Sequence, residues 1–319
     1  MPPLLEVRNL MTYFPTRDAL VKAVRGLEFT LDAGETLALV GESGCGKSIT
    51  ALSLLRLVPE PGRIVEGEIL FEGQDLRRLL PEEMRRIRGN DIAMIFQEPM
   101  TSLNPVFRIG EQIGEVLRLH KGLDRKEALD AAVDLLDQVG IPSARQRVHE
   151  YPHQLSGGMR QRVVIAMALA CDPKLLIADE PTTALDVTIQ AQIMALLDSL
   201  KQERGMATLL ITHDLGVVAE SADRVAIMNS GLIMEQAAVD VIFSRPRHPY
   251  TQGLLACIPR LGHKKDRLVP IDSQVPVGTD LAPGSSYLDR CPAPFAPQRG
   301  KLPPLREVEP GHFVRCWSC

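Results

Sequence analysis

Short apolar runs alternate with helix-like patterns through most of this 319-residue chain. Residues 36–40, 175–178 and 208–211 are almost wholly apolar, which predicts buried strands. Each run is followed by a polar or glycine-bearing loop and then by a helical pattern, an order typical of a parallel sheet covered by helices. Residues 5–10 alternate with a period of two, which indicates a half-exposed antiparallel strand. We therefore expect an α/β fold that binds its ligand at the carboxyl ends of strands.

The middle of the chain follows the helical period instead. Between Asp124 and Val139 the apolar residues recur at helical spacing, and Glu127 stands three residues after Asp124, as at a helix start. A second amphipathic stretch runs over residues 109–117. Residues of about 100–160 are therefore expected to form a helical insertion within the α/β domain.

Composition narrows the class of protein. Half of the 24 prolines fall after residue 244, which predicts a loop-rich extension with one short helix at 249–257. The 36 basic and 40 acidic residues give a net charge of −4, so we expect no nucleic-acid partner. The longest apolar run, at 163–171, is too short to span a bilayer, and residues 1–10 lack the pattern of a secretory signal. We expect a chain that works on the cytoplasmic side.

A glycine-rich segment at 41–48 follows the first buried strand and matches the phosphate-binding pattern G-x-x-x-x-G-K-S. Its glycines let backbone N–H groups turn toward phosphate oxygens, and the helix that follows adds partial positive charge. The Lys47 ammonium would reach the β and γ phosphates, and the Ser48 hydroxyl would ligate Mg²⁺. The alternative is a chance glycine-rich turn. The residues expected to contact nucleotide here are Gly41, Glu42, Ser43, Gly44, Cys45, Gly46, Lys47, Ser48 and Ile49.

Cys45 admits two interpretations. It is either a small filler of the loop or a reactive thiol whose pKa is lowered by Lys47 and by the helix N-terminus. The second interpretation predicts that alkylation blocks ATP hydrolysis and that bound ATP protects the thiol.

Two further segments contain candidate functional residues. Asp179 and Glu180 end a buried strand, where Asp179 would hold Mg²⁺ and Glu180 would act as general base toward water. Ser156, Gly157 and Gly158 stand at the start of an apolar helix and offer a second anion site. The alternatives are an ordinary turn at a strand end and an ordinary helix cap.

The order of these motifs resembles that of the nucleotide-binding subunit of an ABC transporter. The segments that carry the resemblance are the phosphate loop, Gln97 in IFQE, LSGGMRQR at 155–162, LLIADEP at 175–181, Ala184-Leu185-Asp186 and His213 in ITHD. The resemblance implies a P-loop ATPase cassette at 4–256, with a mixed sheet core, an antiparallel N-terminal subdomain and the helical insertion, followed by a C-terminal extension at 257–319. It also implies two cassettes that close head to tail around two ATP molecules.

The resemblance assigns roles residue by residue. Lys47, Gln97, Glu180 and His213 would be catalytic, and Ser48, Gln97 and Asp179 would hold Mg²⁺ through ATP. Asp186 would lie at the dimer interface. Phe14 would stack on adenine, with Tyr13 as the fallback, although a core or surface aromatic is the alternative for Phe14. Ser156, Gly157 and Gly158 would contact the ATP of the opposite cassette.

Finer features resemble the dipeptide/oligopeptide permease branch of that family. They are FQEPMTSLNP at 96–105, EYPHQLS at 150–156, RHPYTQGLL at 247–255 and HFVRCW at 312–317. The branch implies a peripheral subunit on the cytoplasmic face of the inner membrane, with two transmembrane permeases, a second ATP-binding subunit in a homo- or heterodimer, and an extracytoplasmic substrate-binding protein as indirect partner. We expect permease contact at residues 100–105, through exposed apolar residues.

Several alternatives stay open at this point. The branch also includes importers of nickel and of glutathione. A non-transport ABC ATPase acting on DNA or ribosomes, and a regulatory module that holds ATP without turnover, are less consistent with the single cassette and the intact catalytic residues. Cys291, His312, Cys316 and Cys319 are a conceivable Cys₃His zinc set, and the branch often carries an iron–sulfur cluster here. Because Ser285 replaces one expected cysteine, we expect unliganded thiols and no metal.

Overall fold

The computed structural model describes residues 2–17, 19–97, 102–182, 185–257 and 301–318. The chain divides into two compact units. The first comprises residues 1–31, 36–77 and 211–319, and the second comprises residues 32–35 and 78–210.

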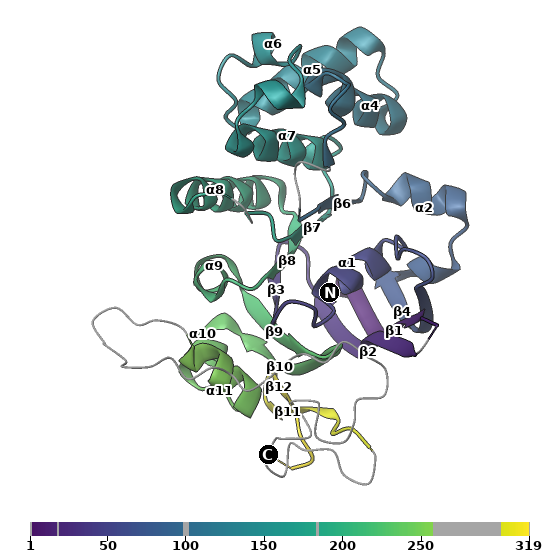
Figure 1. Ribbon diagram of the computed structural model, residues 1–319, viewed down its shortest axis with the longest axis vertical. Coiled ribbons are helices and arrows are strands. Elements are labelled where there is room, and N and C mark those ends of the chain that lie inside the picture. Colours follow the sequence, from purple (N-terminus) through teal and green to yellow (C-terminus); the bar gives the residue numbers. More distant parts are fainter. Residues whose placement is uncertain (1, 18, 98–101, 183–184, 258–300, 319) are drawn as a thin grey trace. The chain divides into compact units, whose positions relative to one another are not determined.

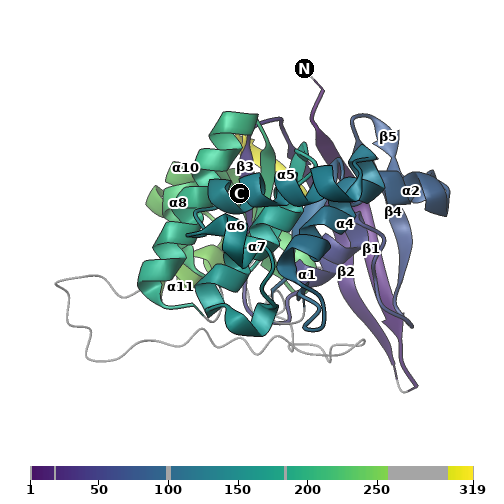
Figure 2. The same ribbon diagram turned by 90° about the horizontal axis from the view of Figure 1, so that it is seen from above.

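The first unit begins with an antiparallel sheet. Its strands, in the spatial order β2-β1-β4-β5, are β1 (Leu5–Pro15), β2 (Leu20–Leu31), β4 (Arg63–Phe71) and β5 (Gln74–Asp75). The strand predicted at residues 5–10 is confirmed and is longer than predicted. Helix α1 (Lys47–Leu54) lies beside β1 and β2 in both views (Figures 1 and 2). The buried hydroxyls of Thr12 and Ser53, 2.8 Å apart, join β1 to this helix.

The same unit holds a second set of strands with mixed directions. Their spatial order is β11 (Leu305–Glu309), β12 (His312–Arg315), β10 (Leu232–Ala238), β9 (Arg224–Asn229) and β3 (Thr36–Val40). Strand β3 pairs in parallel with β9, whereas the other neighbouring pairs are antiparallel. The helices of this part are α9 (Leu215–Ser221), α10 (Val239–Ser244) and α11 (Pro249–Ala256). One apolar core is common to β3, β9, β10 and the three helices.

The strands β11 and β12 correct the sequence prediction, which gave this region only loops and one short helix. The hairpin extends the sheet from β10, with Glu235 opposite Val314 and Gln236 opposite Phe313. Its outer strand reads LREVE and is largely polar, so it carries no apolar run that would reveal a strand. The helix predicted at 249–257 is confirmed as α11.

The second unit combines parallel strands with helices. Its strands β6 (Ile92–Ile95) and β7 (Leu175–Asp179) pair in parallel. Strand β8 (Ala207–Thr212) begins in this unit and crosses into the first unit after residue 210. The α-helices of the second unit are α2 (Pro81–Ile87), α4 (Ile109–Lys121), α5 (Arg125–Gln138), α6 (Ala144–Arg147), α7 (Gly157–Leu169) and α8 (Val187–Arg204). Two short 3₁₀ turns lie at Leu76–Arg78, on the boundary of the units, and at Pro152–Gln154.

The helices α4–α7 form the helical insertion that the sequence predicts (Figure 1). Their apolar faces meet in one core with Ala93 and Ile95 of β6. The Asp124 carboxylate accepts from the backbone N–H groups of Lys126 and Glu127, each at 2.8 Å, and Glu127 accepts from the Asp124 N–H. Helix α5 therefore begins with the predicted capping box. Among the described helices, none is long and apolar enough to cross a membrane.

The cap of α5 gives a first prediction. Asp124→Ala removes the acceptor for two backbone N–H groups and should lower the free energy of unfolding by about 1 kcal/mol. Asp134→Ala, at an exposed position inside the same helix, should change it by less than about 0.5 kcal/mol. Urea unfolding of both variants measures the difference, and equal stabilities would contradict the capping assignment.

Candidate active site

The phosphate loop is built by backbone conformations that only glycine adopts readily. Gly44 and Gly46 have φ angles of +80° and +109°. A side chain on Gly46 would collide with the carbonyl of Ala23 in β2, and one on Gly41 would collide with the carbonyl of Met228 in β9. The loop therefore lies directly against two strands, and it delivers the chain into α1 at Lys47.

Lys47 is nearly buried and is held by the loop itself. Its Nζ donates to the carbonyl oxygens of Gly41 at 2.8 Å and Glu42 at 3.0 Å. Ser48 follows in the first turn of α1, beside backbone N–H groups that have no partner inside the helix. An ammonium group, a hydroxyl and a helix N-terminus thus gather at one loop, which suits a polyphosphate.

Cys45 corrects one of the two sequence interpretations. The side chain is 1% exposed, and its Sγ lies 3.9 Å from Lys47 Nζ. Burial raises the pKa of the thiol above its ordinary value and outweighs the opposing effect of the Lys47 charge. The predicted lowering of the pKa is therefore wrong, and the residue is a filler of the loop.

In the second unit, the structure brings Gln97 and Glu180 together. Asp179 is buried at the end of β7, and Glu180 follows it with a φ of +47°. The Gln97 side chain, just beyond β6, donates from Nε2 to Glu180 Oε2 at 3.0 Å. Holding a non-glycine residue in the left-handed region costs about 1 kcal/mol, so this conformation needs its surroundings to maintain it.

The segment 156–158 begins α7. The Ser156 hydroxyl accepts from the Met159 N–H at 3.4 Å, as a cap. A side chain on Gly158 would meet Ile189 of α8 at 2.9 Å, so this glycine is needed for close helix packing. Gln161, which the sequence analysis did not single out, donates from its buried Nε2 to the Pro181 carbonyl at 2.6 Å. This bond connects the start of α7 to the segment after Glu180.

The remaining predicted residues lie on separate elements. Asp186 caps α8 by accepting from the Ile189 N–H at 3.0 Å, while Ala184 lies outside the described residues. His213 is exposed directly after β8. Phe14 pairs with Val21 of β2, two residues from Ala23, and a side chain on Gly62 would collide with its ring.

Tyr13, the fallback for Phe14, is engaged elsewhere. Its hydroxyl donates to Met11 Sδ at 3.2 Å, and Lys22 Nζ lies 5.8 Å from the ring centroid. The predicted set therefore falls into two groups. The phosphate loop, Phe14 and His213 belong to the first unit, whereas Gln97, Asp179, Glu180, Asp186 and residues 156–158 belong to the second.

The exposed apolar side chains expected at residues 100–105 differ from those that the structure shows. Met100 and Thr101 lie outside the described residues, and Leu103 is 2% exposed in the core of the second unit. The exposed apolar side chains are instead Val106 and Phe107, at 70% and 55%. The permease contact at residues 100–105 stays a prediction, and the exposed apolar side chains of the described part lie just after that segment.

The C-terminal cysteines also differ from the expectation of free thiols. Cys316 is buried and disulfide-bonded. His312 is occupied, because its Nε2 lies 2.8 Å from Glu235 Oε1. Cys291 and Cys319 lie outside the described residues, and within the described part of the chain no three His, Cys, Asp or Glu side chains cluster as metal ligands.

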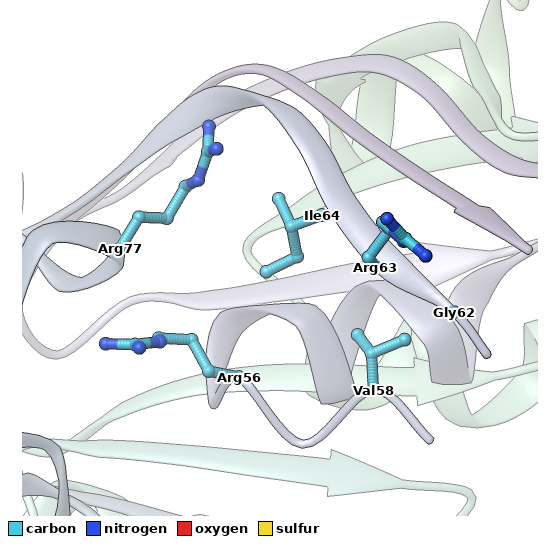
Figure 3. A pocket seen from close by; sticks show the side chains of 6 residues that line it. All are labelled: Arg56, Val58, Gly62, Arg63, Ile64 and Arg77. Atoms are coloured by element: carbon cyan, nitrogen blue, oxygen red, sulfur yellow. The ribbon is translucent and has the colours of Figure 1, made fainter. Parts of the chain in front are cut away.

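A pocket of about 310 Å³ lies in the first unit, apart from the predicted nucleotide residues in sequence. It is lined by Arg56, Val58, Gly62, Arg63, Ile64 and Arg77 (Figure 3). Arg56 Nη1 donates to the Leu76 carbonyl at 3.1 Å, and the Arg77 guanidinium donates to the Gly67 carbonyl. The three guanidinium groups point in different directions, so they do not define a common anion site (Figure 3).

Fold and site together define a P-loop nucleotide-binding cassette. Comparison with known proteins agrees: residues 24–183 match the ABC transporter family, and residues 234–296 match the oligopeptide/dipeptide transporter C-terminal region. The chain therefore belongs to the ABC transporter family, and it is an ATP-binding ATPase of that family.

Curated relatives match over almost their whole length. The oligopeptide transport ATP-binding protein AppD of Bacillus subtilis is 53% identical, with coverage of 99% of this chain and 97% of the relative. OppD of Haemophilus influenzae, another oligopeptide transport ATP-binding protein, is 51% identical over 99% of this chain and 98% of its own. Among solved structures, the dimeric ABC transporter cassette MJ0796 is 27% identical with a TM-score of 0.66, over 74% of this chain and 98% of that chain.

The environment of Cys45 makes a prediction about reactivity. Burial disfavours the thiolate, so at every pH below its raised pKa this thiol carries less of the reactive form than an exposed cysteine. Iodoacetamide at pH 8 should label Cys45 at least about tenfold more slowly than the partly exposed Cys257. Peptide mapping by mass spectrometry separates the two sites, and equal labelling rates at pH 7–8 would contradict the assignment.

Proposed function

We propose that this chain is the ATP-hydrolysing subunit of an importer of short peptides. It works at the inner face of the cell membrane, with two permease subunits and a second cassette, and it serves an extracytoplasmic substrate-binding protein only indirectly. The observation that carries peptide import is the likeness to oligopeptide transport ATP-binding proteins over 99% of this chain, together with the matching C-terminal region at 234–296.

The phosphate loop supplies the binding site for the nucleotide. Backbone N–H groups of residues 41–48 and the N-terminus of α1 face the phosphates, and Lys47 exchanges its bonds to the Gly41 and Glu42 carbonyls for bonds to phosphate oxygens. Phe14, placed on β1 close along β2 to the loop, stacks on adenine.

The residues present suit a magnesium ion. Asp179 is a buried carboxylate at a strand end, and such a group needs a nearby cation or hydrogen-bond donors. Asp179, Ser48 and Gln97 all carry the oxygen ligands that Mg²⁺ prefers, and we assign the ion to them. When bound, Mg²⁺ neutralises phosphate charge and orients the phosphate groups for attack.

Glu180 performs the proton transfer. Its carboxylate takes a proton from the water that attacks the γ phosphate, and the 3.0 Å bond from Gln97 fixes the direction of that carboxylate. His213 contacts the γ phosphate and completes the catalytic set with Lys47. Gln97 also connects two parts of the mechanism. It holds the Glu180 carboxylate, and it stands just before residues 100–105, where we expect the permease to bind.

The second half of each site comes from a partner cassette. Ser156, Gly157 and Gly158 begin a 13-residue helix whose N-terminus favours negative charge, and they bind the ATP held by the opposite phosphate loop. Asp186 lies at that interface. The dimeric cassette MJ0796, a solved structure of TM-score 0.66 to this chain, supports such a pair.

The assignment of the base gives a direct prediction. Glu180→Gln keeps the shape and the bond to Gln97 but cannot accept the proton, so ATP turnover should fall at least about 100-fold while MgATP binding persists. Glu220→Gln, an exposed position on α9, is the control and should keep the wild-type rate. Wild-type turnover in Glu180→Gln would refute the general-base role.

Glu180→Gln also tests whether two copies of this chain can form the working dimer. Trapped ATP should drive Glu180→Gln into a dimer, which size-exclusion chromatography with and without MgATP detects. A persistent monomer that binds ATP would mean that the working pair needs a different ATPase subunit.

Uptake measurements test the substrate class. In cells that lack this gene, the wild-type gene should restore the uptake of labelled oligopeptides, and Glu180→Gln should not. Parallel assays with labelled nickel and glutathione address the two alternatives within the branch. Restoration of nickel or glutathione uptake without peptide uptake would overturn the peptide assignment.

A further inference from the structure

The C-terminal part of the chain makes a direct contact with the phosphate loop. Tyr250, in the second position of α11, is fully buried, and its hydroxyl donates to Glu42 Oε2 at 3.2 Å. Burial raises the pKa of this phenol, so it remains protonated and acts as a donor. The two residues are 208 positions apart in the sequence, and Tyr250 belongs to the segment 247–255, which the sequence links to a short helix and to the permease branch but not to the nucleotide site.

Tyr250 is itself held in place through a buried carboxylate. Glu235 of β10 is fully buried and accepts from the backbone N–H groups of Arg247 at 2.7 Å and His248 at 3.0 Å. His312 of β12 lies 2.8 Å from the same carboxylate. The His248 ring then caps α11 by accepting from the Tyr250 N–H at 3.1 Å. A continuous set of bonds thus runs from the C-terminal hairpin to Tyr250.

Glu42 places a negatively charged side chain in a loop that binds phosphate. Its carbonyl helps to hold Lys47 at 3.0 Å and accepts from the Cys45 N–H at 3.3 Å, so its backbone is part of the loop. Its side chain is a carboxylate, which repels the phosphates that the loop must bind. The Tyr250 hydroxyl donates a hydrogen bond that holds the Glu42 carboxylate on the side of α11. This orientation limits the repulsion and restricts the motion of the loop around Glu42.

We propose that Tyr250 is a positioning residue for nucleotide binding, which holds the Glu42 carboxylate against α11 and so makes this helix a support of the phosphate loop. The proposal rests on the nucleotide site assigned above. Tyr250 acts through Glu42 and takes no part in proton transfer, so its removal affects the affinity for ATP and leaves the catalytic step unchanged.

The test compares MgATP affinities of the full-length chain by isothermal titration. Tyr250→Phe keeps the buried ring and removes only the hydroxyl. It should raise the Kd for MgATP about tenfold, because the Glu42 carboxylate is then no longer held on the side of α11 and repels the phosphates more strongly. In the assembled ATPase, KM should rise similarly while kcat stays within about twofold. Thr251→Val is the matched control, because this neighbouring hydroxyl is also buried and has no hydrogen-bond partner among the described residues.

Two Glu42 variants test whether the Tyr250 hydroxyl acts by positioning the Glu42 carboxylate or only by stabilising the fold. Glu42→Asp withdraws the carboxylate from Tyr250 without touching α11 and should raise the Kd as Tyr250→Phe does. In a Glu42→Gln background the repelling charge is gone, so adding Tyr250→Phe should change the Kd by less than about threefold. A structural role for the hydroxyl would give the full loss in both backgrounds.

The outcomes distinguish this inference from the proposed function. A wild-type chain that does not bind MgATP would refute the nucleotide site itself. A wild-type chain that binds, with Tyr250→Phe and Glu42→Asp binding equally well, would overturn the positioning role alone. The positioning role would also be overturned if Tyr250→Phe raised the Kd for MgATP by the same factor in the wild-type chain and in the Glu42→Gln variant. The effect of the hydroxyl would then not depend on the Glu42 carboxylate.

Discussion

The backbone of the phosphate loop lies so close to the neighbouring strands that two of its positions have no room for a side chain. Gly41 faces the Met228 carbonyl and Gly46 faces the Ala23 carbonyl. This close approach sets where α1 begins, and the start of α1 sets where Lys47 and Ser48 lie. The binding chemistry of the first unit therefore depends on a packing constraint between a loop and the strands β2 and β9.

The second unit holds the Glu180 side chain in one orientation. Glu180 adopts a left-handed backbone conformation after the buried end of β7, and Gln97 donates a hydrogen bond to its carboxylate. Gln161 ties the following segment to α7, the helix that begins with residues 156–158. Glu180, the end of β7 and the start of α7 are thus connected within one unit, so a displacement of α7 would change the surroundings of Glu180.

Local patterns predicted those parts of the fold that local physics decides. The buried strand at 36–40, the capping box at Asp124 and the glycine-dependent backbone of residues 41–48 all depend on residues a few positions apart, and the structure has all three. The predictions that failed depend on distant parts of the chain. The pKa of Cys45 is governed by burial rather than by its neighbour Lys47, and Leu103 is covered by helices that follow it. The hairpin β11–β12 was missed because its polar outer strand pairs with β12, which in turn pairs with β10, a strand far away in the sequence. The contact between Tyr250 and Glu42 joins two segments that no local pattern relates.

The central claim is that the phosphate loop is the nucleotide site and that Lys47 is its principal cation. The most direct measurement is the Kd for MgATP of the full-length wild-type chain and of Lys47→Ala. We expect saturable binding by the wild-type chain and a loss of at least about 100-fold in Lys47→Ala, since a nearly buried ammonium that meets phosphate charge is removed. Equal affinities for the two proteins would contradict it.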